Sequence, residues 1–152
     1  MRRIAALIAL VFLTAIGCAT TTSGAGFAGY KWSVVAIDHA GRETPVPSMY
    51  SVSLQFTPAG QFGANDSVNY HSGTYRQIDG GFTTSHLGTT LVGYMGNNPV
   101  VLAAQSAIAA FGSGTRATAT VTGNRLVVTV AGYMITCQRA GKQPDFPPAK
   151  PT

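Results

Sequence analysis

Short runs of alternating apolar and polar residues, separated by turn-forming residues, fill most of the chain between residues 29 and 139. The clearest run is 50–56, where Tyr50, Val52, Leu54 and Phe56 share one face of a strand and Ser51, Ser53 and Gln55 share the other. A sheet with one dry and one wet face is typical of antiparallel pairing. We therefore expect a mainly β fold of roughly eight short strands, closed into a small antiparallel barrel or a strongly curled sheet.

Turn residues set the expected strand boundaries. Gly60 to Tyr75 is expected to be a turn region between two strands, and residues 39–48, with two prolines, form a loop that should not continue a sheet. Asp79-Gly-Gly81 and Gly123-Asn124 are expected to be hairpin turns. The predicted strands are 29–38, 50–56, a short return from Phe62, 73–78, 81–87, 115–122, 125–131 and 133–139.

One stretch has helical rather than strand periodicity. Asn98-Pro99 supplies an N-cap and a first helical residue, and one apolar stripe follows, made of Val101, Ala104, Ile108 and Phe111. The stretch has no charged residue, so packing on a sheet must stabilise it. We expect one capping α-helix near 98–112.

The N-terminal segment predicts export. Two arginines precede an apolar run from Ile4 to Ile16, which is too short for the roughly 20 residues of a transmembrane helix. Residues 1–17 are expected to be a signal peptide, with a lipobox-like end at Ala15 to Cys18 that favours lipidation of Cys18. The alternative is ordinary cleavage after Ala19, which would leave a freely secreted protein.

The remaining organisation follows from composition and cysteine count. Residues 18–28 are expected to be a flexible tether, 29–140 the β domain and 141–152 a Pro-rich disordered tail. If Cys18 is acylated, Cys137 is left as a small buried hydrophobe in the last strand. If Cys18 keeps its thiol, a Cys18–Cys137 disulfide stays open.

Charge excludes one class of partner. Without Arg2 and Arg3 the chain has eight Lys/Arg against five Asp/Glu, and the basic residues are scattered. A nucleic-acid surface would need a basic patch with interleaved aromatics, so we expect no nucleic acid as a partner.

Several short motifs occur in a fixed order between residues 27 and 139: Trp32 on the first strand, Phe56 to Gly60, Asn69-Tyr-His-Ser-Gly73-Thr-Tyr75, Thr89 to Gly93, the helix start at Asn98 and the Gly123-Asn124 hairpin. This order resembles the META/HslJ-like domain family of bacterial envelope proteins. The resemblance implies a β-barrel related in architecture to lipocalin-type barrels, and many family members are lipoproteins. It implies no established chemistry, since the family is linked loosely to envelope stress, drug tolerance and virulence.

The departures from the family pattern concern cysteines. Where the pattern has Gly-Cys before the central Asn, this chain has Ser67-Val68, and the second cysteine is replaced by Gly93 or Gly96. Both are lost together, as expected if they pair in relatives.

Residues for catalysis or metal binding are sparse. The three histidines, His39, His71 and His86, are far apart and have no zinc-ligand spacing. Asp66 and Asp79 are interpreted as turn formers. A catalytic triad of Asp38, His86 and a serine stays open, but nothing specific in the sequence favours it. We therefore expect no enzyme activity, metal or cofactor.

The most suggestive polar cluster is in the central turn. Asn69, His71 and Tyr75 are the candidate rim for contact with a partner, whereas in the structural alternative Asn69 caps the turn and Gly73 has a positive φ. The aromatic residues Trp32, Tyr50, Phe56, Phe62 and Phe82 either fill the core or line a small apolar pocket.

The sequence thus favours a monomeric, membrane-anchored or secreted envelope protein that acts by protein–protein contact in envelope maintenance or stress. The alternatives are a lipocalin-like carrier of a small apolar or lipid ligand and a hydrolase whose site is not visible in the sequence.

Overall fold

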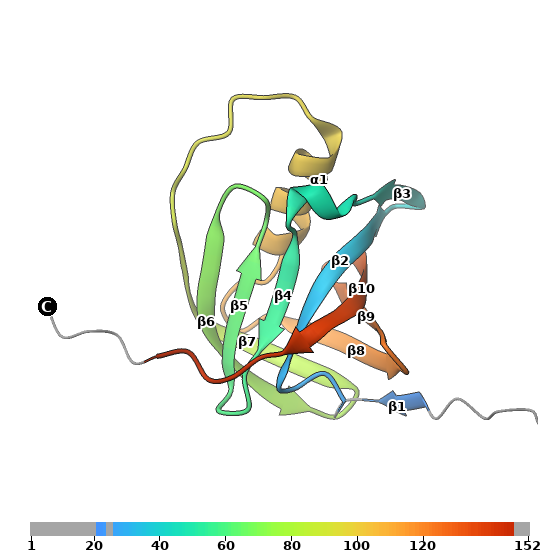
Figure 1. Ribbon diagram of the computed structural model, residues 1–152, viewed down its shortest axis with the longest axis vertical. Helices are drawn as coiled ribbons and strands as arrows, with labels where there is room; N and C mark the ends of the chain where they lie inside the picture. Colours follow the sequence, from blue (N-terminus) through green and yellow to red (C-terminus); the bar gives the residue numbers. More distant parts are fainter. Residues whose placement is uncertain (1–20, 24–25, 148–152) are drawn as a thin grey trace, which may run out of the picture.

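The computed structural model describes residues 21–23 and 26–147, which form ten strands and one α-helix (Figure 1). The strands are β1 Thr21–Ser23, β2 Tyr30–His39, β3 Arg42–Pro45, β4 Ser53–Phe56, β5 Gln61–Asn65, β6 Tyr70–Ile78, β7 Gly81–Thr89, β8 Arg116–Thr122, β9 Arg125–Val130 and β10 Tyr133–Lys142. The α-helix, α1, is Pro99–Ala109, and Ser48–Tyr50 form one 3₁₀ turn. No helix among the described residues has the length and hydrophobicity needed to cross a membrane.

Eight of the strands close into a barrel, as predicted. Their order is β8-β7-β6-β5-β4-β2-β10-β9, and β9 pairs back with β8, with antiparallel register throughout. β1 pairs with the end of β8, at residues 120–122, beyond the part of β8 that pairs with β7. β3 pairs with the end of β2 and is not one of the eight barrel strands. Because closure leaves few free edges, short strands joined by tight turns are sufficient to build this fold.

The barrel interior is filled with aromatic side chains. Phe27, Phe56, Phe62 and Phe82 are fully buried, and their ring centroids lie 4.8 to 6.3 Å apart in edge and tilted contacts. Trp32 is also fully buried, and its indole N–H donates to the Phe27 carbonyl at 3.0 Å. This packing confirms the core prediction for Trp32, Phe56, Phe62 and Phe82 and weighs against an internal ligand pocket lined by these rings. Tyr50, the fifth predicted residue, is only half-buried at the edge of the core.

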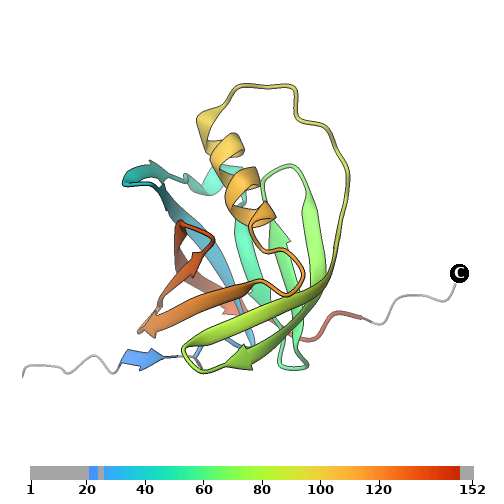
Figure 2. The same ribbon diagram turned by 180° about the vertical axis from the view of Figure 1, so that it is seen from behind.

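α1 covers one end of the barrel (Figure 2). The side chain of Asn98 accepts hydrogen bonds from the amides of Val100 and Val101 at 2.9 and 3.4 Å, and Pro99 is the first helical residue, as predicted. The predicted apolar stripe is buried against the core, and the helix contacts β2 and β3. The helix ends at Ala109, three residues before the predicted end, and Gly114 has a φ of +79° in the turn that follows.

The stretch from Gly60 to Tyr75 is mostly strand, so its prediction as a turn region was wrong, although the strands predicted from Phe62 and over 73–78 are present as parts of β5 and β6. β5 and β6 occupy most of it, and only residues 66–69 turn between them. Gly73 serves close packing rather than a turn: a Cβ there would lie 2.6 Å from the Ser85 carbonyl oxygen, and φ at Gly73 is not positive, whereas Gly60 has a φ of +85° in the turn before β5. Glycine gives the same sequence signal in a turn and at a close backbone approach.

Two further boundaries differ from the predictions. Residues 42–45, expected to be loop, pair with β2 as the edge strand β3, where Pro45 at the strand end interrupts no ladder within the sheet. The predicted strand 50–56 begins only at Ser53, since Ser51 adopts a left-handed φ of +53° after the 3₁₀ turn. Ser53 is buried, so the outer face of this strand is not uniformly wet.

The tail and the tether are also more ordered than predicted. β10 extends to Lys142, and residues 143–147 lie against the β4–β5 hairpin, where the Asp145 carboxylate accepts from the Ala59 amide at 2.9 Å and the Phe146 amide donates to the Gln61 side chain at 2.7 Å. The predicted tether of 18–28 contains β1. The predicted signal peptide, Cys18 and residues 148–152 lie outside the described residues.

Candidate functional site

The connection between β7 and α1, residues 90–98, exposes large apolar side chains. We call it the apolar loop. Leu91 is 94% exposed, Val92 58% and Met95 99%, and the segment carries no charge. It runs from the β6–β7 side of the barrel to the start of α1, at the end of the barrel that the helix covers (Figure 1). Met49, 82% exposed on the 3₁₀ turn, lies at the same end, since its neighbour Tyr50 accepts through its hydroxyl from the Asn98 side chain at 2.9 Å.

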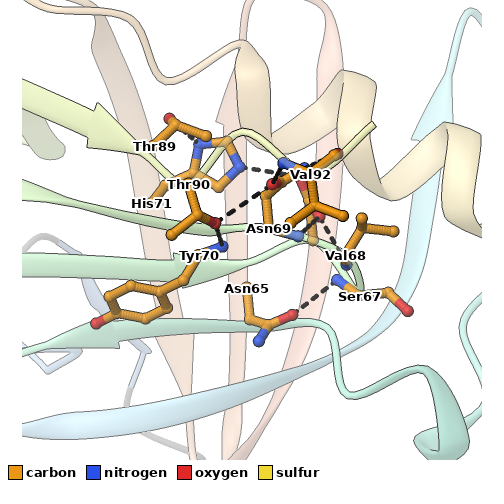
Figure 3. A network of polar contacts seen from close by, with 10 residues as sticks. Asn65, Ser67, Val68, Asn69, Tyr70, His71, Thr89, Thr90 and Val92 are labelled. Carbon is orange, nitrogen blue, oxygen red and sulfur yellow. Dashed lines mark hydrogen bonds and ion pairs between the residues drawn. The ribbon is translucent and has the colours of Figure 1, made fainter. Parts of the chain in front are cut away.

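The tight turn between β5 and β6 satisfies its own backbone. The Asp66 carboxylate accepts from the amides of Val68 and Asn69 at 2.9 and 2.6 Å, and the Asn65 side chain accepts from the Ser67 amide at 2.7 Å (Figure 3). Asp66 is therefore a turn former, as predicted.

Asn69 connects this turn to the apolar loop. Its side-chain oxygen accepts from the Val92 amide at 2.7 Å, and its side-chain nitrogen donates to the Val92 carbonyl at 3.1 Å (Figure 3). Thr90 adds three contacts: its hydroxyl donates to the Asn69 oxygen at 3.3 Å and accepts from the Tyr70 amide at 3.0 Å, and its amide donates to the Tyr70 carbonyl at 3.0 Å. The buried side-chain amide of Asn69 thus binds both backbone groups of Val92, as a neighbouring strand would. The apolar loop therefore leaves the barrel at a fixed position.

Asp66, His71 and Thr89 form a hydrogen-bonded series beneath the apolar loop. The Asp66 carboxylate lies 2.9 Å from His71 Nε2, and the Thr89 hydroxyl lies 2.8 Å from His71 Nδ1. The Asp66 and His71 side chains are 3% and 13% exposed, so their contact is well shielded from solvent. A carboxylate, an imidazole and a hydroxyl in this order can pass a proton, although the three best-formed pockets of the described residues are lined by other side chains.

The structure brings two of the three predicted rim residues together. Asn69 and His71 belong to the network of Figure 3. Tyr75 does not: its ring lies in the core, its hydroxyl donates to the Thr57 carbonyl at 2.8 Å, and burial raises the pKa of that hydroxyl. The prediction that Tyr75 belongs to the rim was therefore wrong. The side chain of Asn69 binds the apolar loop, whereas its backbone closes the turn: the Asn69 amide donates to the Asp66 carboxylate, and the Asn69 carbonyl accepts from the Asp66 amide at 3.0 Å.

The other titratable residues do not assemble into a site. His39 stacks on Tyr133 with ring centroids 4.2 Å apart, and His86 has a left-handed φ of +54° where the β6–β7 register shifts. Asp38 lies on β2, which does not neighbour β7, so the Asp38–His86 triad does not form. Among the described residues no group of three His, Cys, Asp or Glu side chains could hold a metal ion.

Cys137 is a free, fully buried thiol, and burial raises its pKa well above the ordinary range.

The sequence reading missed Asp66 as the partner of His71, and it missed Thr89, Thr90 and Val92 altogether. One signal was available: Leu91, Val92 and Met95 occur among glycines without strand or helix periodicity, which places apolar side chains on a loop.

Comparisons with known proteins identify the fold and nothing beyond it. No protein-family model and no curated protein matches the chain. An NMR structure of a protein from Burkholderia xenovorans is similar at a TM-score of 0.59 and 19% identity, over 75% of this chain and 83% of that one. A second NMR structure of a protein is similar at a TM-score of 0.58 and 17% identity, over 76% of this chain and 92% of that one. At these identities the likeness shows a shared barrel fold.

Proposed function

We propose that the protein is an exported, non-enzymatic lipoprotein domain of the META/HslJ-like kind that works by protein–protein contact through the apolar loop. The observation that carries this proposal is the near-complete exposure of Leu91 and Met95 on a loop whose backbone is held by the buried Asn69. Exposed apolar side chains that gather on one surface mark interaction sites, and methionine is enriched in interfaces.

Energetics favour such a loop as a binding surface. Burying each of the exposed Leu and Met side chains would contribute about 1.5–3 kcal/mol. A loop fixed at Val92 by Asn69 and at Asn98 by Tyr50 loses less conformational entropy on binding than a free one would. The surface therefore offers affinity without a large ordering penalty.

The direction of the loop fits an anchored protein. β1, which follows Cys18 by three positions, lies at the opposite end of the barrel from α1 and the apolar loop (Figure 1). A lipid on Cys18 would attach the β1 end to the membrane and leave the apolar loop facing the aqueous envelope space. A soluble or peripheral protein, rather than the anchoring membrane, is then the partner.

Site-specific photo-crosslinking in the source cells tests the contact. A benzophenone amino acid at Leu91 or Met95 should give one discrete protein adduct, whereas the same probe at Thr120, exposed on β8, should give none. Equal adducts from both positions, or none from the loop, would contradict the proposal.

The lipid anchor is tested separately by intact mass measurement of the protein extracted from its membranes. A mass that fits cleavage before Cys18 plus a diacylglyceryl or triacyl adduct is expected. A mass that begins at Thr20 without an adduct would replace the anchored form by the freely secreted one.

A hydrolase is the second candidate, because Asp66, His71 and Thr89 are joined at 2.9 and 2.8 Å in the order of an acid–histidine–hydroxyl relay. A fluorophosphonate probe should then label Thr89 and fail to label Thr89→Val. Absence of labelling in the folded wild-type protein would remove this candidate.

A further inference from the structure

A second surface feature, separate from the apolar loop, is a pocket between α1, the β2–β3 hairpin and the start of β10. Its volume is about 440 Å³, within the range of small-molecule sites. α1 contributes Leu102 and Ala103, β2 contributes His39, and β10 contributes Tyr133. The pocket lies outside the filled barrel core, so it is not the internal cavity of a lipocalin-type carrier.

The walls of the pocket suit a flat apolar body. His39 and Tyr133 stack with their planes 14° apart and together line one side. Leu102, 44% exposed, and the small Ala103 line the helix side. An aromatic ring between these surfaces would bury apolar area and contact a π face.

The charge of the pocket selects an anion. Arg42 is the one charged side chain in its lining, and it forms no ion pair with any described residue. The two nearest acids in sequence do not line the pocket: the Asp38 carboxylate accepts from the Gly41 amide at 3.2 Å, and Glu43 lines a different pocket. A guanidinium without a carboxylate partner is the group best suited to bind a ligand carboxylate in a bidentate manner.

We propose that this pocket binds a small aromatic monocarboxylate of one or two rings, with the ring against His39, Tyr133 and Leu102 and the carboxylate on Arg42. The hydroxyl of Ser106, which also lines the pocket, is a further donor to the ligand. This site is independent of the protein contact proposed for the apolar loop.

The test is a titration of the full-length chain in mild detergent with indole-3-acetate, followed by calorimetry and by amide chemical shifts. Saturable shifts are expected at Ala103, Ser106 and Tyr133. The neutral isostere indole-3-acetamide should bind at least about tenfold more weakly, because the charge-assisted bond to Arg42 is lost.

Variants locate the site. Arg42→Gln should weaken indole-3-acetate binding by about tenfold or more, and Ala103→Leu should block the pocket to a similar degree. Arg76→Gln is the matched control, since Arg76 is an exposed arginine on β6 that does not line the pocket, and it should bind as the wild type does. Absence of saturable shifts at the three amides, equal binding of acid and amide, or an equal loss in Arg76→Gln would overturn the proposal.

Discussion

Replacing Asn69 by alanine tests whether one buried amide holds the apolar loop. The substitution removes the contacts of the Asn69 side chain with the Val92 amide at 2.7 Å, the Val92 carbonyl at 3.1 Å and the Thr90 hydroxyl at 3.3 Å. Each contributes about 0.5–1.5 kcal/mol net. The apolar loop can open, and water can then hydrate the freed groups of Val92. The free energy of local opening at Val92 should therefore fall by about 2 kcal/mol, which is less than the sum of the three upper values.

Native-state hydrogen exchange reports this loss at one amide. Since 1.4 kcal/mol corresponds to a factor of ten, protection of the Val92 amide should fall roughly 30-fold in Asn69→Ala, while amides of the central strands keep theirs. Asn65→Ala is the matched control, because it removes one side-chain hydrogen bond from the same turn without touching the apolar loop.

Two results would refute this reasoning. One is a Val92 amide that exchanges in the wild type as fast as an unstructured amide. The other is an equal fall of Val92 protection in Asn65→Ala and Asn69→Ala.

Three further predictions concern the barrel. Ala131 has a φ of +45° in the β9–β10 turn, so Ala131→Asn should stabilise the protein by about 0.5–1 kcal/mol and raise Tm by a few degrees in a thermal melt; a lower Tm would contradict this. Gly81→Ala should destabilise by more than about 3 kcal/mol in urea unfolding, since its Cβ would lie 2.0 Å from the Ala117 carbonyl oxygen, whereas Gly88→Ala meets nothing within 4 Å and should stay within about 0.5 kcal/mol; equal effects would count against the packing. Cys137 is buried with a raised pKa, so iodoacetamide at pH 8 should label it only after unfolding in guanidinium chloride, and rapid labelling of the folded protein would be inconsistent with its burial.

The barrel was predictable because its signals are local. Alternation in runs such as 116–122 identifies strands, and Asp79-Gly80 and Gly123-Asn124 identify hairpins, without knowledge of which strands pair. The helix was equally clear, since Asn98-Pro99 and the stripe after it are a complete start signal.

The candidate site was only partly predictable because it depends on register. The predicted rim of Asn69, His71 and Tyr75 assumed that the strand begins only at Gly73, whereas β6 begins at Tyr70 and directs Tyr75 into the core. The partner of His71 is Asp66 across a tight turn, and the partner of Asn69 is Val92, 23 residues away. No periodicity in the sequence encodes either contact.

The backbone order of the apolar loop, measured by ¹⁵N relaxation on the full-length chain, tests most directly whether the docking surface is preformed. Because Asn69 fixes this part of the loop, we expect order parameters of about 0.85 at Leu91 and Val92, as in the barrel strands. Values below about 0.6 at both residues would mean that the exposed apolar side chains belong to a mobile segment, and would contradict a preformed docking surface.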